Sequence, residues 1–164
     1  MMTVLMLGSA TIGSADTVLV AWEVMVDRNT DRQRTDLTLL TADLVATSID
    51  VDVSIRNTGQ TLLRDFDDWD VMMQYYGTSS NQNLELLYVE YVATTTLASG
   101  EWTIEDIYLN VASTTPEVYD PDVLNPGEEI VVRIKIDPAI PTSTDNLITI
   151  STPNGVTLSA PFSR

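Results

Sequence analysis

The chain has 164 residues, of which 24 are Asp or Glu and 8 are Lys or Arg, so its formal net charge is −16. That charge argues against nucleic acid as a partner, because nucleic-acid binding needs basic surface, and against peripheral docking on anionic lipid. Cysteine and histidine are both absent. Without them the sequence has no disulfides, no thiol chemistry, no common zinc ligands and no usual general base. We therefore expect no enzyme and no resident cofactor, and an enzyme built on acidic residues is a remote third hypothesis.

The first 26 residues, MMTVLMLGSATIGSADTVLVAWEVMV, are apolar on nearly every side and carry only two charges, Asp16 and Glu23. The next ten, DRNTDRQRTD, contain six charged residues. As a helix the first stretch would be about 39 Å long, at about 1.5 Å per residue. A helix that is apolar all round has to be buried on every side. What buries this helix is therefore the main clue to the function of the protein.

Several interpretations of this stretch compete. A cleaved secretory signal would carry basic residues before its apolar core, and none precedes Arg28. A simple transmembrane anchor needs about 20 apolar residues, and Asp16 interrupts the run at a cost in lipid. A core helix inside one globular domain is disfavoured, because the rest of the chain can close its own core. We favour a helix that other copies of itself bury in the core of a fibre.

In that interpretation the large apolar side chains of the helix form the filament core, and Trp22 fills a seam between helices rather than anchoring at a membrane interface. The residues expected to pack there are Val4, Leu5, Leu7, Ile12, Val18, Leu19, Trp22, Val24 and Met25. Leu37, Leu40 and Leu44 follow at helical spacing. We therefore extend the helix and define residues 1–48 as an assembly helix and residues 49–164 as an outer domain.

The outer domain has the patterning of β-structure. Ile49, Val51, Val53 and Ile55 alternate with polar residues, which predicts a strand with one wet face. Asn154-Gly155 between two apolar-alternating runs predicts a hairpin. Further strands are expected at 69–76, 84–92, 102–111, 129–137, 147–151 and 156–160. The predicted fold class is α+β, a long N-terminal hydrophobic helix followed by an immunoglobulin-like antiparallel β-sandwich of about seven strands.

Two acidic clusters are candidate cation sites. Asp65, Asp67, Asp68 and Asp70 place four carboxylates within six residues, and Ca²⁺ takes several oxygen ligands. The spacing differs from that of an EF-hand, and a solvated acidic turn is the simpler explanation of the cluster. A weaker cluster comprises Glu117, Asp120 and Asp122.

Three pieces of the sequence belong together: the apolar N-terminal helix, the strand and turn at residues 51–59 (VDVSIRNTG), and LNPGE at 124–128 with TPNGV at 152–156. In this combination they resemble the archaellin superfamily, which comprises archaeal flagellins and their stator-like archaellum relatives. The superfamily is similar to type IV pilins, whose leader is removed by a dedicated peptidase. The resemblance therefore implies that Met1 is a processed N-terminus.

The resemblance implies a structural subunit that polymerises through its helix into an extracellular, cell-surface motility filament. Its partners would be other copies of itself, with minor filament subunits and a membrane assembly platform. The alternative is a membrane-tethered, envelope-binding β-sandwich module, either stator-like or an adhesive pilin-like one.

Overall fold

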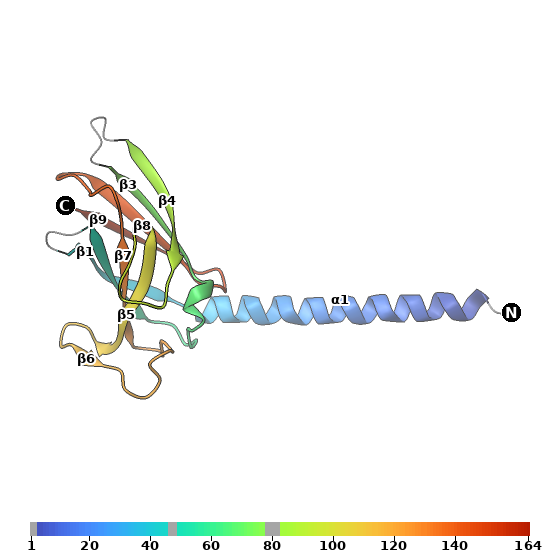
Figure 1. Cartoon of the computed structure of the whole chain (residues 1–164). Helices are drawn as coiled ribbons and strands as arrows, with labels where there is room; N and C mark the ends of the chain where they lie inside the picture. Colours follow the sequence, from blue (N-terminus) through green and yellow to red (C-terminus); the bar gives the residue numbers. More distant parts are fainter. Residues whose placement is uncertain (1–2, 46–48, 78–82) are drawn as a thin grey trace.

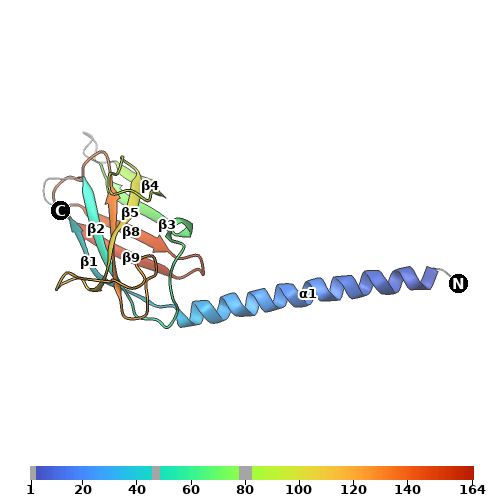
Figure 2. The same cartoon turned by 60° about the horizontal axis from the view of Figure 1, so that its bottom comes forward.

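The computed structural model describes residues 3–45, 49–77 and 83–164, with the side chains of its helix from Thr17 onward. The helix, α1, spans Thr3–Arg34. It extends away from a β-domain that holds the rest of the described chain (Figures 1 and 2). The last turn of α1 carries Arg32 and Arg34, where positive charge complements the helix dipole.

Nine strands and one short 3₁₀ helix make up the β-domain. In chain order they are β1 (Leu37–Leu44), β2 (Asp50–Asn57), η1 (Phe66–Asp68), β3 (Asp70–Tyr76), β4 (Leu84–Tyr91), β5 (Glu101–Asn110), β6 (Thr115–Pro116), β7 (Glu129–Lys135), β8 (Asp145–Ser151) and β9 (Thr157–Ser163).

The strands form one hydrogen-bonded sheet in the order β1-β2-β7-β5-β4-β3-β8-β9, with β6 paired to β5. All neighbours are antiparallel except β4 and β5, which run parallel and pair only at Glu90–Glu101 and Tyr91–Trp102. The sheet curls so that β1 lies against β9, and the result is a nearly closed, barrel-like fold (Figure 1).

The predicted fold class is therefore wrong. The chain does not form a helix to residue 48 followed by a seven-stranded immunoglobulin-like antiparallel sandwich, because the sheet has nine strands, one parallel pair and a continuous path. Each of the seven predicted strands does correspond to an observed one: they are β2, β3, β4, β5, β7, β8 and β9. The strands β1 and β6 were not predicted. The order in which strands pair is set by tertiary packing, so strand positions alone did not reveal it.

The helix ends at Arg34, and residues 37–44, predicted as helix, form β1 instead. A β-bulge explains the error, because the pairing of β1 with β2 shifts register between Leu39 and Thr41. One extra residue in a bulge changes the two-residue period of a strand. Leu37, Leu39, Ala42 and Leu44 then face inward, whereas Leu40, on which the helical prediction relied, is exposed.

The core lies between the faces of the curled sheet. Val51, Val53 and Ile55 of β2 are fully buried and lie opposite Ile134, Val132 and Ile130 of β7, which are also fully buried. Ile148 and Ile150 of β8 join the same core. The β-domain thus buries its own apolar face without help from α1.

Candidate assembly site: the exposed helix and its junction

Large apolar side chains on the described part of α1 are open to solvent. Val18, Leu19 and Trp22 are 67%, 61% and 62% exposed, and Val24 and Met25 are also exposed. These are five of the nine residues predicted to pack in an assembly core. The other four, Val4, Leu5, Leu7 and Ile12, lie on α1, but their side chains are outside the described residues. Exposed apolar surface of this kind is typical of surfaces that contact another molecule.

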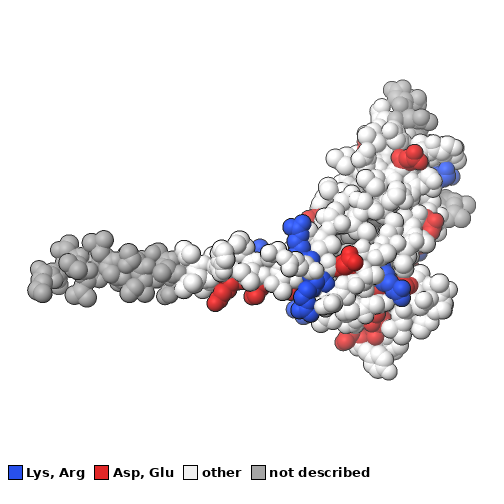
Figure 3. Space-filling model, turned by 180° about the vertical axis from the view of Figure 1, so that it is seen from behind, with Lys and Arg blue, Asp and Glu red and all other residues white. Residues whose placement is uncertain are grey.

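Acidic and basic side chains lie in separate rows along α1. Glu23, Asp27 and Asp31 recur every four residues and so form an acidic row along the helix, and Arg28 and Arg32 form a basic row beside it. Figure 3 shows acidic side chains along one side of the helix and basic ones gathered where it meets the domain. Among the described residues none of these five side chains is ion-paired. Both rows are free to contact another molecule.

Thr35 holds the end of the helix against the domain. Its backbone N–H donates to the carbonyl of Asp31 at 2.9 Å and its hydroxyl to the same oxygen at 2.8 Å. The Oγ1 atom of Thr35 also accepts from Nδ2 of Asn154 at 2.6 Å and lies 3.0 Å from Oγ1 of Thr61. Two separate loops of the domain therefore contact one buried residue at the helix end.

The turn Asn57-Thr58-Gly59, predicted only as the end of a strand, fastens the same junction. The N–H groups of Thr58 and Gly59 both donate to the carbonyl of Asp36 at 3.0 Å, and the N–H of Gln60 donates to the carbonyl of Arg34 at 2.7 Å. A Cβ atom on Gly59 would lie 2.5 Å from the nitrogen of Asp36. Only glycine allows this close approach, so the sequence of the turn sets the direction of α1.

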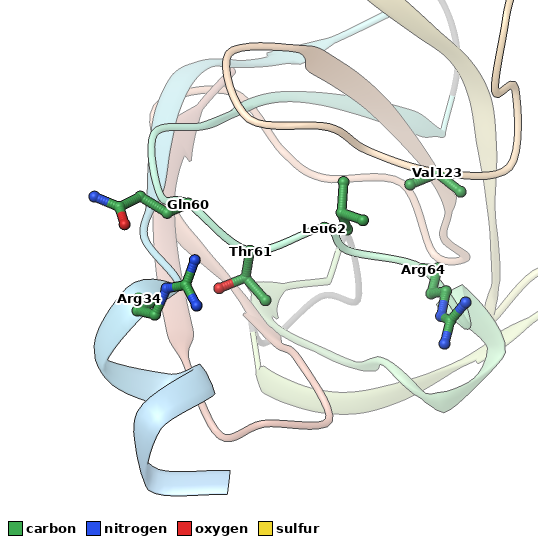
Figure 4. A pocket seen from close by; sticks show the side chains of 6 residues that line it. All are labelled: Arg34, Gln60, Thr61, Leu62, Arg64 and Val123. Carbon is green, nitrogen blue, oxygen red and sulfur yellow. The ribbon is translucent and has the colours of Figure 1, made fainter. Parts of the chain in front are cut away.

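Two hollows flank the junction. One, of about 380 Å³, is lined by Arg34, Gln60, Thr61, Leu62, Arg64 and Val123. Figure 4 shows Arg34 on the helix and Arg64 at opposite sides of this hollow. The other, of about 460 Å³, lies along the helix and is lined by Trp22, Met25, Val26, Arg28, Asn29, Arg32 and Asn154. Both offer apolar surface beside Arg side chains at the base of the helix.

The aspartates predicted as a Ca²⁺ site lie around η1. Asp65 precedes η1 in a left-handed conformation (φ 53°) and forms an exposed ion pair with Arg64 at 3.6 Å. Asp70 accepts a hydrogen bond from the hydroxyl of Tyr88 at 2.8 Å. Over the described residues, no three His, Cys, Asp or Glu side chains gather as a metal site would require. The Ca²⁺ prediction at Asp65, Asp67, Asp68 and Asp70 stays a prediction without support from this geometry.

Glu117, the centre of the weaker acidic cluster, has a local structural role. Its carboxylate accepts hydrogen bonds from the N–H of Tyr119 at 2.7 Å and of Asp120 at 2.8 Å. The bond from Tyr119 is the largest cause of a lowered pKa for Glu117, opposed by partial desolvation. The carboxylate thus shapes the turn that exposes Val118 and Tyr119.

Sequence reasoning missed an ion-pair network on the outer face of the sheet. Arg133 of β7 donates through Nε and Nη2 to the two carboxylate oxygens of Asp52, both at 2.8 Å, and its Nη1 lies 2.7 Å from Oε2 of Glu105. The hydrogen bond to Asp52 is the main cause that raises the pKa of Arg133. The alternation of Asp52 and of Arg133 along their strands was visible, but their pairing needed the register of β2 with β7.

Within the described residues, no helix is long and apolar enough to cross a membrane.

No family model matches the sequence, and no curated protein is significantly similar to it. Solved structures do match. The archaellum periplasmic stator protein FlaG from Sulfolobus acidocaldarius has a TM-score of 0.55 and 21% identity, over 78% of this chain and 99% of that one. A structure of FlaF and FlaG in complex, from the same organism, matches with a TM-score of 0.54 and 21% identity. The match covers 77% of this chain and 87% of that one. This chain shares the fold of an archaellum stator protein.

A filament structure, the archaeal flagellum of Methanospirillum hungatei strain JF1, matches over 98% of this chain and 81% of that one. Its TM-score is 0.49 at 12% identity. A similarity of this size carries no argument for a filament.

Proposed function

We propose that this chain is a non-catalytic structural component of an archaellum, of the stator type, which is tethered to the cell envelope by α1 and presents its β-domain to other proteins. The observation that carries the proposal is the shared fold with the periplasmic stator protein FlaG, nearly all of which is matched by this chain. The matched protein is also found in a complex with FlaF, so we propose association with other archaellum components for this chain too.

The geometry of the helix supports a tether. The exposed apolar side chains of Val18, Leu19 and Trp22 need cover from another molecule, and burying each contributes about 1.5–3 kcal/mol. The junction at Thr35 and Gly59 fixes the direction in which α1 leaves the domain. A load applied to the domain would therefore be passed to the helix through hydrogen bonds and close packing rather than through a slack linker.

A filament subunit is the second candidate, and the exposed helix itself favours it. Sister helices in a fibre core would cover Val18, Leu19 and Trp22, and the acidic row of one helix could face the basic row of another. Heterologous contacts of this kind build open helical assemblies. Because the fold of the β-domain is shared with a stator protein, we rank the filament second.

The experiment that separates the two candidates is a measurement of where the protein resides. Cells of the source organism are sheared, and the chain is quantified in the released filaments and in the washed envelopes by mass spectrometry. The stator proposal expects the chain in the envelopes and only traces in the filaments. If the chain is a major protein of the sheared filaments, the stator proposal is wrong and the chain is a filament subunit.

A further inference from the structure

One strand of the β-domain has an unpaired edge. β4 pairs with β3 along its length, from Leu84 to Val89. On its other side β4 meets β5 only at Glu90 and Tyr91. Over the described residues no strand pairs with the other side of residues 84–89. An edge of this kind presents free backbone donors and acceptors to any added strand.

Two hydrogen bonds show which backbone groups are free. The carbonyl of Asn83 accepts from Gly77 on the β3 side, whereas the N–H of Glu90 donates to Gly100 on the other side. Backbone groups alternate in direction along a strand that has antiparallel neighbours. The N–H and C=O groups of the three even-numbered residues between these points therefore face the open edge; these residues are Leu84, Leu86 and Tyr88.

The same three residues carry exposed apolar side chains. Leu84, Leu86 and Tyr88 are 52%, 76% and 61% exposed, and Met72, opposite Tyr88 on β3, is 40% exposed. The hydroxyl of Tyr88 donates to Asp70 at 2.8 Å, which holds the ring in place. Edge strands are usually protected by lysine, proline or a bulge, and β4 (LELLYVEY) has none of these. The edge is therefore built to accept a strand.

We propose that β4 pairs with β4 of a second copy of this chain, antiparallel about a two-fold axis at Leu86. Leu86 then faces Leu86 of the other copy, and Leu84 faces Tyr88. This register uses all three residues with free backbone groups on each chain, and it continues the sheet from one molecule into the next. A two-fold contact of this kind closes on itself and yields a dimer.

The charges of β4 suit a second copy. In this register each Glu85 lies opposite Leu87, so no acidic residue faces another directly, although each chain has a net charge of −16. Like charges placed directly opposite each other would destabilise the pair, whereas apolar cross-strand pairs stabilise it. The edge residues themselves are uncharged and provide no group that would select a basic strand instead.

Cysteine cross-linking of the full chain, kept in mild detergent, tests the register, because the natural chain has no cysteine. Opposed residues have Cα atoms about 5.5 Å apart, within the range of about 4.4–6.8 Å for a disulfide. We expect Leu86→Cys to form a covalent dimer on mild oxidation. Leu84→Cys and Tyr88→Cys should cross-link poorly alone but well when mixed. Leu109→Cys, an exposed position on β5, is the matched control.

A cross-linking yield of Leu86→Cys no higher than that of Leu109→Cys would overturn the proposal, as would equal yields at 84, 86 and 88. A second variant, Leu86→Pro, removes an N–H that faces the open edge and leaves the bonds to β3 intact. When Leu86→Pro is introduced as a second substitution into both the Leu84→Cys and the Tyr88→Cys chain, the cross-linking yield of the mixture should fall to the control level. The circular dichroism spectrum should stay unchanged. A negative result leaves the envelope proposal standing, because that proposal does not depend on β4.

Discussion

Asn154 and Thr35 are 119 residues apart in sequence, yet Nδ2 of Asn154 donates to Oγ1 of Thr35 at 2.6 Å. The bond joins the hairpin between β8 and β9 to the residue that directly follows α1. Thr35 is buried and also bonds to the carbonyl of Asp31 inside the helix. Contacts with the hairpin between β8 and β9 therefore help to fix the direction in which α1 leaves the domain.

Asn154→Ala removes this contact, and we expect it to loosen the junction without unfolding the domain. The loss of one such hydrogen bond costs about 1 kcal/mol of the free energy of unfolding. Spin labels on cysteines introduced at Val20 and Ser159, both exposed, would report the angle of α1. We expect a broader distance distribution in Asn154→Ala than in the otherwise natural chain. An unchanged distribution would show that Asn154 does not hold the helix.

Gly59→Ala adds only one methyl group, but it should destabilise the protein clearly. The added Cβ would lie 2.5 Å from the nitrogen of Asp36 and 2.6 Å from the carbonyl oxygen of Arg34, both backbone atoms. Overpacking of this kind costs about 1–3 kcal/mol. Urea unfolding measures the change, with the exposed neighbour Gln60→Ala as the control. Equal stability of the two variants would contradict the close approach.

The turn held by Glu117 should weaken in acid. Its pKa is lowered from an ordinary value of 4.5 in the folded state, chiefly by the hydrogen bond from Tyr119. A group with a lowered folded pKa contributes stability above its unfolded pKa and loses it as pH falls through the folded one. We therefore expect the Tyr119 and Asp120 amide signals in NMR spectra to follow the protonation of Glu117 with a midpoint below pH 4.5.

Glu117→Gln is the control for this titration, because the side-chain amide of glutamine does not ionise in this pH range. The part of the Tyr119 amide shift that follows the titration of Glu117 should then disappear. A Glu117 titration midpoint at or above 4.5 would contradict the hydrogen-bonded carboxylate.

Leu19→Glu should impair assembly and leave the domain folded. Leu19 is 61% exposed, so the change removes no core contact, but it places a charge in the apolar surface that we propose for assembly. The loss of about 1.5–3 kcal/mol of apolar burial corresponds to association weakened about 10-fold or more. Binding to washed envelopes measures this, and Gln33→Glu adds the same charge at an exposed position near the junction. Equal binding by the two variants would contradict the role of Leu19.

The strands with strict alternation were predictable from the sequence. Val51, Val53 and Ile55 face one core, as do Ile130, Val132 and Ile134, because a period of two places every second side chain on one face. β1 was not predictable, since the bulge between Leu39 and Thr41 disguised its period. Nor was the parallel pair of β4 and β5, because only two residues of each strand form it.

The candidate site was predictable in composition but not in geometry. The apolar helix was evident from its residues, and the turn at Gly59 and the hairpin at Asn154 were both expected. That the turn and the hairpin meet at Thr35 depends on how the sheet curls. Contacts between residues this far apart in sequence leave no local pattern, so the junction could be found only in the folded chain.

The most direct test of the tether is the accessibility of Leu19 in the assembled state. Leu19→Cys gives a chain with a single thiol, which can be labelled with a maleimide in washed envelopes and, separately, in the detergent-purified protein. Ser159→Cys, exposed on β9, reports general access of the reagent. We expect Leu19→Cys to be protected in envelopes and labelled when purified, with Ser159→Cys labelled in both. Full labelling of Leu19→Cys in envelopes would contradict assembly through the helix.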